Sequence, residues 1–151
     1  MLRQAFTDRL KQALKAGDAR TLSTVRLILA GLKERDVAAR GQADYEGIPE
    51  PDIQRMLQAM IKQRRESIAL YEQGKRTDLA QQEREEIAVI ESFLPRQFDE
   101  TEIESTVKAM IAQTGAAGVK DMSRVMAALR ERYAGVIDFG RASAIARRHL
   151  G

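Results

Sequence analysis

The 151-residue chain contains no cysteine, which excludes disulfide bonds and cysteine-ligated metal sites. Tryptophan is absent, and histidine occurs once, at His149, so a metal cluster built from several histidines is excluded. No run of about 18 apolar residues is present, which predicts that no segment spans a membrane. Because the amphipathic N-terminus is also unlike a secretory signal, we expect a cytoplasmic protein without a metal or cofactor.

Proline is scarce as well, with three residues in the whole chain, and no stretch alternates apolar and polar residues over a strand length. Long windows are rich in Ala, Leu, Glu, Gln, Lys and Arg, which favour helices. Apolar residues recur at intervals of three and four, the period of amphipathic helices. The sequence therefore predicts an all-α protein, with an N-terminal four-helix part over 1–95 and a small three-helix tail over 96–151.

The most regular stretch covers residues 52–94 and predicts two long helices folded back on each other at Gly74. We expect Gly74 to end the first helix with a positive φ and Thr77 to cap the second helix. Two glycines and a proline break the pattern over 38–49, which predicts a mobile surface loop before the hairpin.

Two charged residues interrupt the apolar stripes of this hairpin. Arg64 lies on the stripe of the first helix and Glu83 on that of the second, at similar distances from the turn. Antiparallel helices would bring them to the same height, so we expect an ion pair between Arg64 and Glu83, flanked by Arg65 and Glu86. A structural role that fixes the register of the helices is one interpretation, and a site that handles a ligand is the other.

The charges of the chain nearly balance, with a formal net charge of +3. Residues 1–95 hold 16 basic and 15 acidic residues, and residues 96–151 hold 9 and 7, so neither part is a polybasic arm. Within the tail, Asp99 or Thr101 can start the first helix, and Thr101 with Glu104 has the spacing of a capping box. Several cations of its last two helices could bind backbone phosphates, namely Lys120, Arg124, Arg130, Arg147 and Arg148.

Three segments closely resemble the GatB/YqeY family: STVRLILAGLK at 23–33, MIKQRRESIALYEQGKRTDLAQQEREEIAVIESFLPRQ at 60–97 and VKDMSRVMAAL at 119–129. The chain is thus similar to a free-standing YqeY-like protein and to the C-terminal region of the aspartyl/glutamyl-tRNA amidotransferase B subunit. The resemblance implies a two-part helical fold, contact with tRNA, and a family-level association with carbon–nitrogen ligases that use glutamine as amido-N-donor.

Three functional hypotheses follow. The first is a non-catalytic accessory module that binds tRNA or another structured RNA, because the residues offer no nucleophile, metal site or ammonia path for an intrinsic activity. The second is an adaptor that docks on an amidotransferase or an aminoacyl-tRNA synthetase through Ile137 and Phe139 in an apolar turn. The third is a component that supports carbon–nitrogen ligase activity only within a complex.

Overall fold

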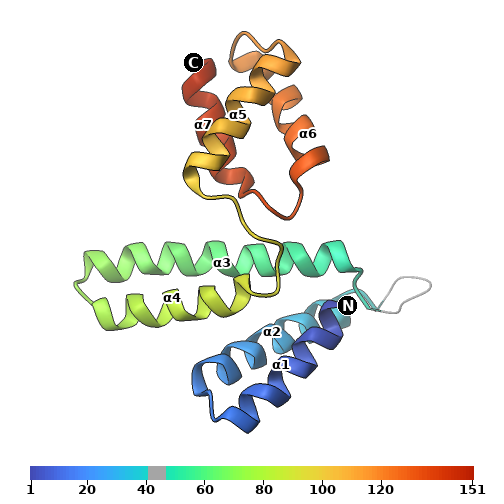
Figure 1. Ribbon diagram of the computed structural model, residues 1–151, viewed down its shortest axis with the longest axis vertical. Coiled ribbons are helices and arrows are strands. Elements are labelled where there is room, and N and C mark those ends of the chain that lie inside the picture. The colour runs from blue at the N-terminus through green and yellow to red at the C-terminus, as the bar shows by residue number, and fades with distance from the viewer. Residues whose placement is uncertain (41–46) are drawn as a thin grey trace. The chain divides into compact units, whose positions relative to one another are not determined.

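The computed structural model describes residues 1–40 and 47–151, and these residues form helices without any β-strand (Figure 1). The predicted all-α class is therefore confirmed. The chain divides into two compact units, unit 1 from Met1 to Leu94 and unit 2 from Pro95 to Gly151. That each unit is a domain able to fold alone stays a prediction. None of the helices in the described ranges combines the length and apolar character that a bilayer crossing requires.

Unit 1 contains α1 (Leu2–Ala16), α2 (Ala19–Ala38), α3 (Glu50–Gln73) and α4 (Thr77–Glu91). Helices α3 and α4 form the antiparallel hairpin that the sequence predicts, and α2 packs against both (Figure 1). Their apolar stripes meet in one core with α1, where Phe6 contacts the ring of Phe93 edge-on at a centroid distance of 4.8 Å. The largest fully buried side chains of this core are Phe6, Ile28, Ile53, Met56, Leu57 and Ile90.

The hairpin turn differs from the predicted one by a single residue. Gly74 has φ −82°, and Lys75 takes the left-handed conformation with φ 57°. The amides of Lys75 and Arg76 donate to the carbonyls of Glu72 and Tyr71, at 3.1 and 2.8 Å, which is the bonding pattern of a Schellman motif. The predicted positive φ at Gly74 is therefore wrong, because the helix ends one residue later. The predicted cap by Thr77 is also wrong, since α4 starts without a side-chain cap bond. Of the loop predicted at 38–49, residues 41–46 lie outside the described part.

A polar clamp holds the end of α2 to the starts of α1 and α3. Arg3 donates to both carboxylate oxygens of Asp36, at 2.8 and 2.9 Å, and to the carbonyl of Ile48 at 3.0 Å. Asp36 also accepts from the amide of Ile48 at 2.9 Å. Arg3 is the main cause that lowers the pKa of Asp36. Gly47 completes the clamp because its φ is 95° and an added Cβ would lie 2.5 Å from Arg3 Nη2.

Unit 2 contains α5 (Glu100–Thr114), a short 3-10 helix η1 (Val119–Asp121), α6 (Met122–Tyr133) and α7 (Phe139–Leu150). Each of the three α-helices packs against the other two around a second apolar core. Asp99 and Glu102 form the capping box of α5. The box predicted at Thr101 and Glu104 is wrong, because the N-cap is Asp99 and both residues already lie inside the helix.

Candidate functional site

Arg64 lies in a largely buried ionic cluster between α3 and α4. Its Nε donates to Glu86 Oε2 at 2.9 Å and lies 3.9 Å from Glu83 Oε2, and its Nη1 donates to the carbonyl of Met60 at 3.1 Å. The side chains of Arg64 and Glu86 are only 12% and 11% exposed. The structure thus brings Arg64, Glu83 and Glu86 together, with Glu86 rather than Glu83 as the nearer carboxylate.

Two further arginines surround this cluster in a way that the sequence did not predict. Arg20 of α2 lies 3.8 Å from Glu86 and donates to Glu85 at 3.1 Å, so α2 is tied to α4 by charge. Arg65, which we expected to flank the pair beside Glu86, donates to Glu91 at 3.3 Å instead. Neighbouring positions on a helix point about 100° apart, so Arg65 cannot face the same carboxylate as Arg64.

The carboxylate of Glu83 is the electrostatically unfavourable member of the cluster. Burial raises the pKa of Glu83, and the nearby charge of Glu86 raises that pKa further, while Arg64 and Arg20 oppose the shift. Within the described ranges, no group of three or more acidic or histidine side chains could hold a metal ion. The cluster can therefore fix how the helices pack, and its role as a structural ion pair stays a prediction.

The basic residues of α7 gather on one side of the helix. At about 100° per residue, Arg141, Arg147 and Arg148 fall within roughly one third of the circumference, with Arg147 opposite the buried Ala142 and Ile145 and the other two arginines bordering that face. All three arginines are exposed. Helix α7 contains no acidic residue. In the part of the chain that the structure describes, neither Arg147 nor Arg148 has a carboxylate partner. This arrangement leaves two adjacent cations available to an anionic partner.

The basic residues of α6 do not gather in this way. By the same helical rotation, Arg124, Arg130 and Arg132 point in three different directions around α6. Arg124 lies 3.4 Å from Asp121, and Arg132 donates to Gln113 at 2.9 Å. The structure therefore does not bring Arg124 and Arg130, the predicted phosphate ligands of α6, together on one face of the helix.

The predicted phosphate ligands of unit 2 lie at two different ends of the unit. Val119 of η1 lies 3.9 Å from the Cβ position of Gly151, so Lys120 belongs to the same end of the unit as the last turn of α7. Arg130, in the last turn of α6, reaches the start of α7, where its guanidinium carbon is 5.5 Å from the centre of the Phe139 ring. Arg147 is roughly 12 Å further along the axis of α7. The set thus divides into an end with Lys120, Arg147 and Arg148 and an end with Arg130.

The apolar turn before α7 is not an exposed docking surface. Ile137 is 1% exposed and belongs to the core of unit 2, so it cannot contact a partner as the adaptor hypothesis requires. Phe139 is half-buried beneath Arg130. The rings of Phe98 and Tyr133 pack against each other with centroids 5.7 Å apart. None of these aromatic rings forms a free platform for stacking an unpaired base.

The match to known families now identifies the chain. A family model described as Yqey-like protein matches residues 3–150. The chain belongs to the Yqey-like family. Similar curated proteins occur in three yeasts, each named "Altered inheritance of mitochondria protein 41, mitochondrial". The Yqey-like chain is 28% identical over 106 residues to that of Lachancea thermotolerans, covering 69% of this chain and 54% of the relative.

Two further relatives of the Yqey-like chain carry the same name. Identity to the protein of Clavispora lusitaniae is 31% over 85 residues, covering 56% of this chain and 46% of that protein. Identity to the protein of Vanderwaltozyma polyspora is 28% over 120 residues, covering 75% and 62%. The Yqey-like chain spans about half the length of the curated relatives it matches. Their names contradict the cytoplasmic location that we expected, because each relative is named as mitochondrial.

Proposed function

We propose that this Yqey-like chain is a non-catalytic module that binds structured RNA, tRNA foremost, through one end of unit 2. Lys120, Arg147 and Arg148 would contact backbone phosphates there, and Arg141 would extend the contact along α7. The observation that carries the proposal is the pair Arg147 and Arg148, exposed on an α7 without acidic residues. Cations that are not neutralised by the protein itself can release counterions when they meet phosphates.

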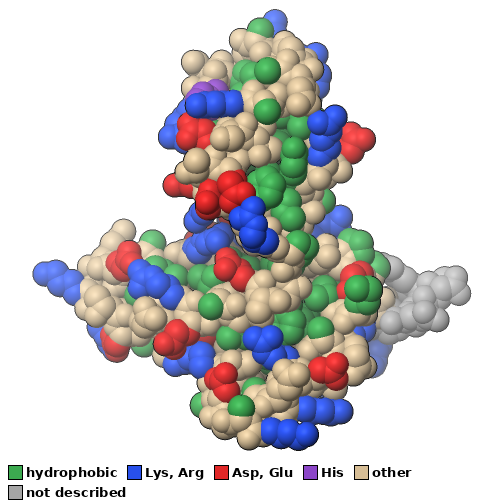
Figure 2. Space-filling model, in the orientation of Figure 1, with side chains coloured by type: hydrophobic (Ala, Val, Ile, Leu, Met, Phe, Trp, Pro, Cys, Tyr) green, Lys and Arg blue, Asp and Glu red, His purple; other side chains and the backbone are tan. Residues whose placement is uncertain are grey.

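The charge distribution within unit 2 supports this location. Residues 119–151 contain seven basic and three acidic residues, whereas residues 95–118 contain two basic and four acidic residues. Acidic and basic side chains are instead interspersed over the face of unit 1 that Figure 2 shows. A phosphate backbone would therefore be attracted to the arginine side of α7 and repelled by the start of α5, whose Glu104 lies 3.3 Å from His149 in the last turn of α7.

The kind of RNA follows from the side chains around these cations. Single strands are usually held by exposed aromatic rings, and in the described part of unit 2 the rings of Phe98, Tyr133 and Phe139 are covered by neighbours. Folded RNA presents its phosphates at fixed positions without requiring base stacking. The proposal therefore favours a folded RNA such as tRNA over an unpaired strand.

A filter-binding titration of the full chain with a tRNA transcript at increasing salt tests the proposal. The double variant Arg147→Gln with Arg148→Gln should bind about tenfold more weakly at low salt and lose about two units of salt slope. The control Arg26→Gln with Lys62→Gln removes the same charge from exposed positions of unit 1 and should bind like the wild type. The relatives' names support testing mitochondrial tRNA in parallel. Wild-type binding without salt dependence, or equal losses in both variants, would refute the proposal.

A further inference from the structure

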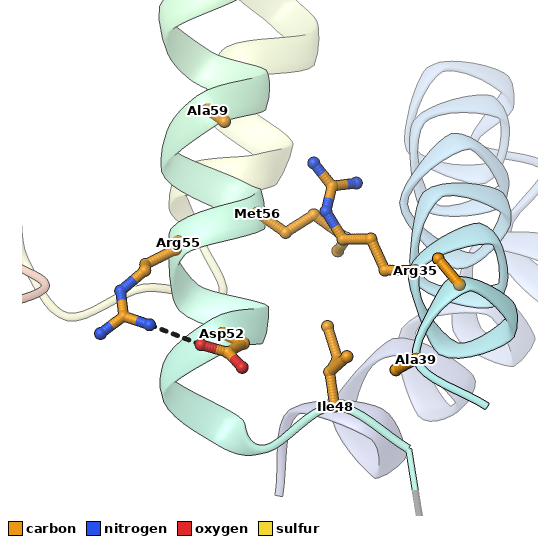
Figure 3. Close-up of a pocket in the computed structure, with 8 residues that line it drawn as sticks. Arg35, Ala39, Ile48, Asp52, Arg55, Met56 and Ala59 are labelled. Carbon is orange, nitrogen blue, oxygen red and sulfur yellow. Dashed lines mark hydrogen bonds and ion pairs between the residues drawn. The ribbon is translucent and has the colours of Figure 1, made fainter. Parts of the chain in front are cut away.

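A groove lies between the end of α2 and the first half of α3, within unit 1 (Figure 3). Its floor is apolar: Ile48 lies at the lower end, and Met56, which is only 1% exposed, lies beneath the surface between α3 and α2. The walls are made of small side chains, Ala38 and Ala39 on α2 and Ala59 on α3. The volume of ≈ 540 Å³ lies in the range typical of binding pockets.

Cations occupy both rims of the groove. Arg55 on α3 forms an ion pair with Asp52 one turn earlier. Arg35 on α2 is exposed and has no acidic partner among the described residues. Its Nη1 and the sulfur of Met56 both lie 3.7 Å from the Cβ position of Gly31, so the guanidinium lies beside the apolar floor. The groove therefore places one uncompensated positive charge next to an apolar lining of alanine and isoleucine side chains.

The floor is also held in place before any ligand binds. The clamp described above fixes Ile48 through both its amide and its carbonyl, which bond to Asp36 and Arg3. A fixed floor lowers the entropic cost of binding. Because Met56 is only 1% exposed, the accessible apolar surface of the groove consists of Ile48 and the alanines. Alanine walls allow the backbone of a partner to approach closely.

We propose that this groove binds an acidic amphipathic segment of a partner protein. An apolar side chain of that segment would lie on Ile48 and the alanine walls, and a neighbouring carboxylate would pair with Arg35. Charge complementarity to Arg35 selects an acidic segment over a basic one. A small molecule fits less well, because the polar groups that line the groove all lie at its rims and none in its floor could orient a ligand. This inference concerns unit 1 alone and is independent of RNA binding.

A peptide titration of the full chain, labelled with ¹⁵N, tests the inference. The probe is a blocked peptide of about fourteen residues with leucine and glutamate at helical spacing, and its matched control has lysine in place of each glutamate. The acidic peptide should shift the amide signals of Ala38, Ala39, Ile48 and Ala59. The lysine peptide should bind at least about tenfold more weakly. Added salt should weaken the binding of the acidic peptide.

Two pairs of variants connect the binding to the groove. Ala59→Trp fills the groove from an exposed position, and Ala69→Trp adds the same side chain at another exposed position of α3. Arg35→Glu reverses the rim charge, and Arg26→Glu reverses an exposed charge elsewhere on α2. The groove variants should weaken peptide binding at least about tenfold, and the controls should change it less than about twofold. Circular dichroism melts of all four variants check that each remains folded.

Several results would overturn the inference. The first is equal binding of the acidic and basic peptides, and the second is an absence of shifts at millimolar peptide. A third is an equal loss of peptide affinity in Ala59→Trp and Ala69→Trp. Shifts of the same amides by decanoate but not by the acidic peptide would assign the groove to a small amphiphilic anion instead.

Discussion

In unit 1 a buried arginine bonds to a carboxylate on a different helix, whereas the last arginines of unit 2 point into solvent. Arg64 in α3 and Glu86 in α4 are 22 residues apart in sequence and nearly buried. The ion pairs within α6 and α7 join residues only three positions apart. Arg147 and Arg148 have no carboxylate partner in the described ranges. Similar side chains thus contribute to packing in one unit and remain available for binding in the other.

This difference has a physical origin in burial. A buried cation must be compensated by the protein, because an uncompensated charge in a poorly solvated place is costly. The hydrogen bonds of such a pair form in only one relative position of the two helices. The pair therefore disfavours other registers. An exposed cation has water as its partner and costs little to keep free. Unit 2 holds its helices with an apolar core and local caps, and polar contacts from His149 and Arg132 to α5 add to these, so the exposed Arg147 and Arg148 need not serve the fold.

The largest effect expected from this comparison is the loss of the buried carboxylate in unit 1. Glu86→Ala leaves Arg64 buried without its nearest partner and should lower the free energy of unfolding by roughly 3 kcal/mol. The control Glu85→Ala removes a neighbouring but half-exposed carboxylate and should cost less than about 1 kcal/mol. Urea titrations followed by circular dichroism measure both. Equal stability of the two variants would contradict a structural role for the cluster.

The sequence predicted the members of this cluster better than its bonds. Arg64 and Glu83 were found because charged residues interrupt apolar stripes of regular period, and Glu86 was expected only as a flanking residue. Counting residues from the turn suggested Glu83 as the nearest partner, but the turn extends to Lys75, so the simple count does not fix the register. The contacts of Arg20 with Glu85 and Glu86 could not be predicted, because the sequence does not show which face of α2 packs against α4. The period of the apolar residues predicted where helices form. The residue pairs that join different helices could be identified only from the structure.

The polar clamp of unit 1 offers the second test. Gly47→Ala forces a side chain into a positive φ and against Arg3, and it should lower the free energy of unfolding by about 1–3 kcal/mol. Gly118→Ala in unit 2 is the matched control, because nothing lies within 4 Å of its Cβ position and its φ is −164°. That control should be neutral or slightly stabilising. Thermal melts of both variants make the comparison. Wild-type stability in Gly47→Ala would show that the clamp accommodates the added Cβ without loss of stability.

The clamp and the groove beside it were not predicted from the sequence at all. Arg3 and Asp36 are separated by 33 residues, and neither interrupts a regular stripe in a way that marks it as a partner. Similarly, the sequence suggested five phosphate ligands in the tail, but only the structure separates Lys120 from Arg130 by the end of the unit at which each lies. The sequence pattern of exposed basic residues does not show which of them, on different helices, lie on the same side of the unit.

The smallest expected effect is a difference in pH dependence between the two units. In unit 2, Arg96 bonds to Glu102 and lowers the pKa of that carboxyl from 4.5 to about 2. The bond therefore adds stability above pH 4.5 that is lost as the pH falls toward 2. In unit 1, burial raises the pKa of Glu83, so the ionised carboxylate opposes folding at neutral pH. That cost disappears as the pH falls through the raised pKa toward 4.5.

Two conservative variants test whether Glu102 and Glu83 change stability in opposite directions. Glu102→Gln should slightly lower stability at pH 7, and the deficit should shrink as the pH approaches 2. Glu83→Gln should slightly raise stability at pH 7, and the gain should vanish near pH 4. Glu100→Gln, an exposed residue in the first turn of α5, is the control for a general change of charge. Urea midpoints measured from pH 7 to pH 2 test both, and the same sign in both variants would mean that the buried carboxylate of unit 1 is as well compensated as the exposed one of unit 2.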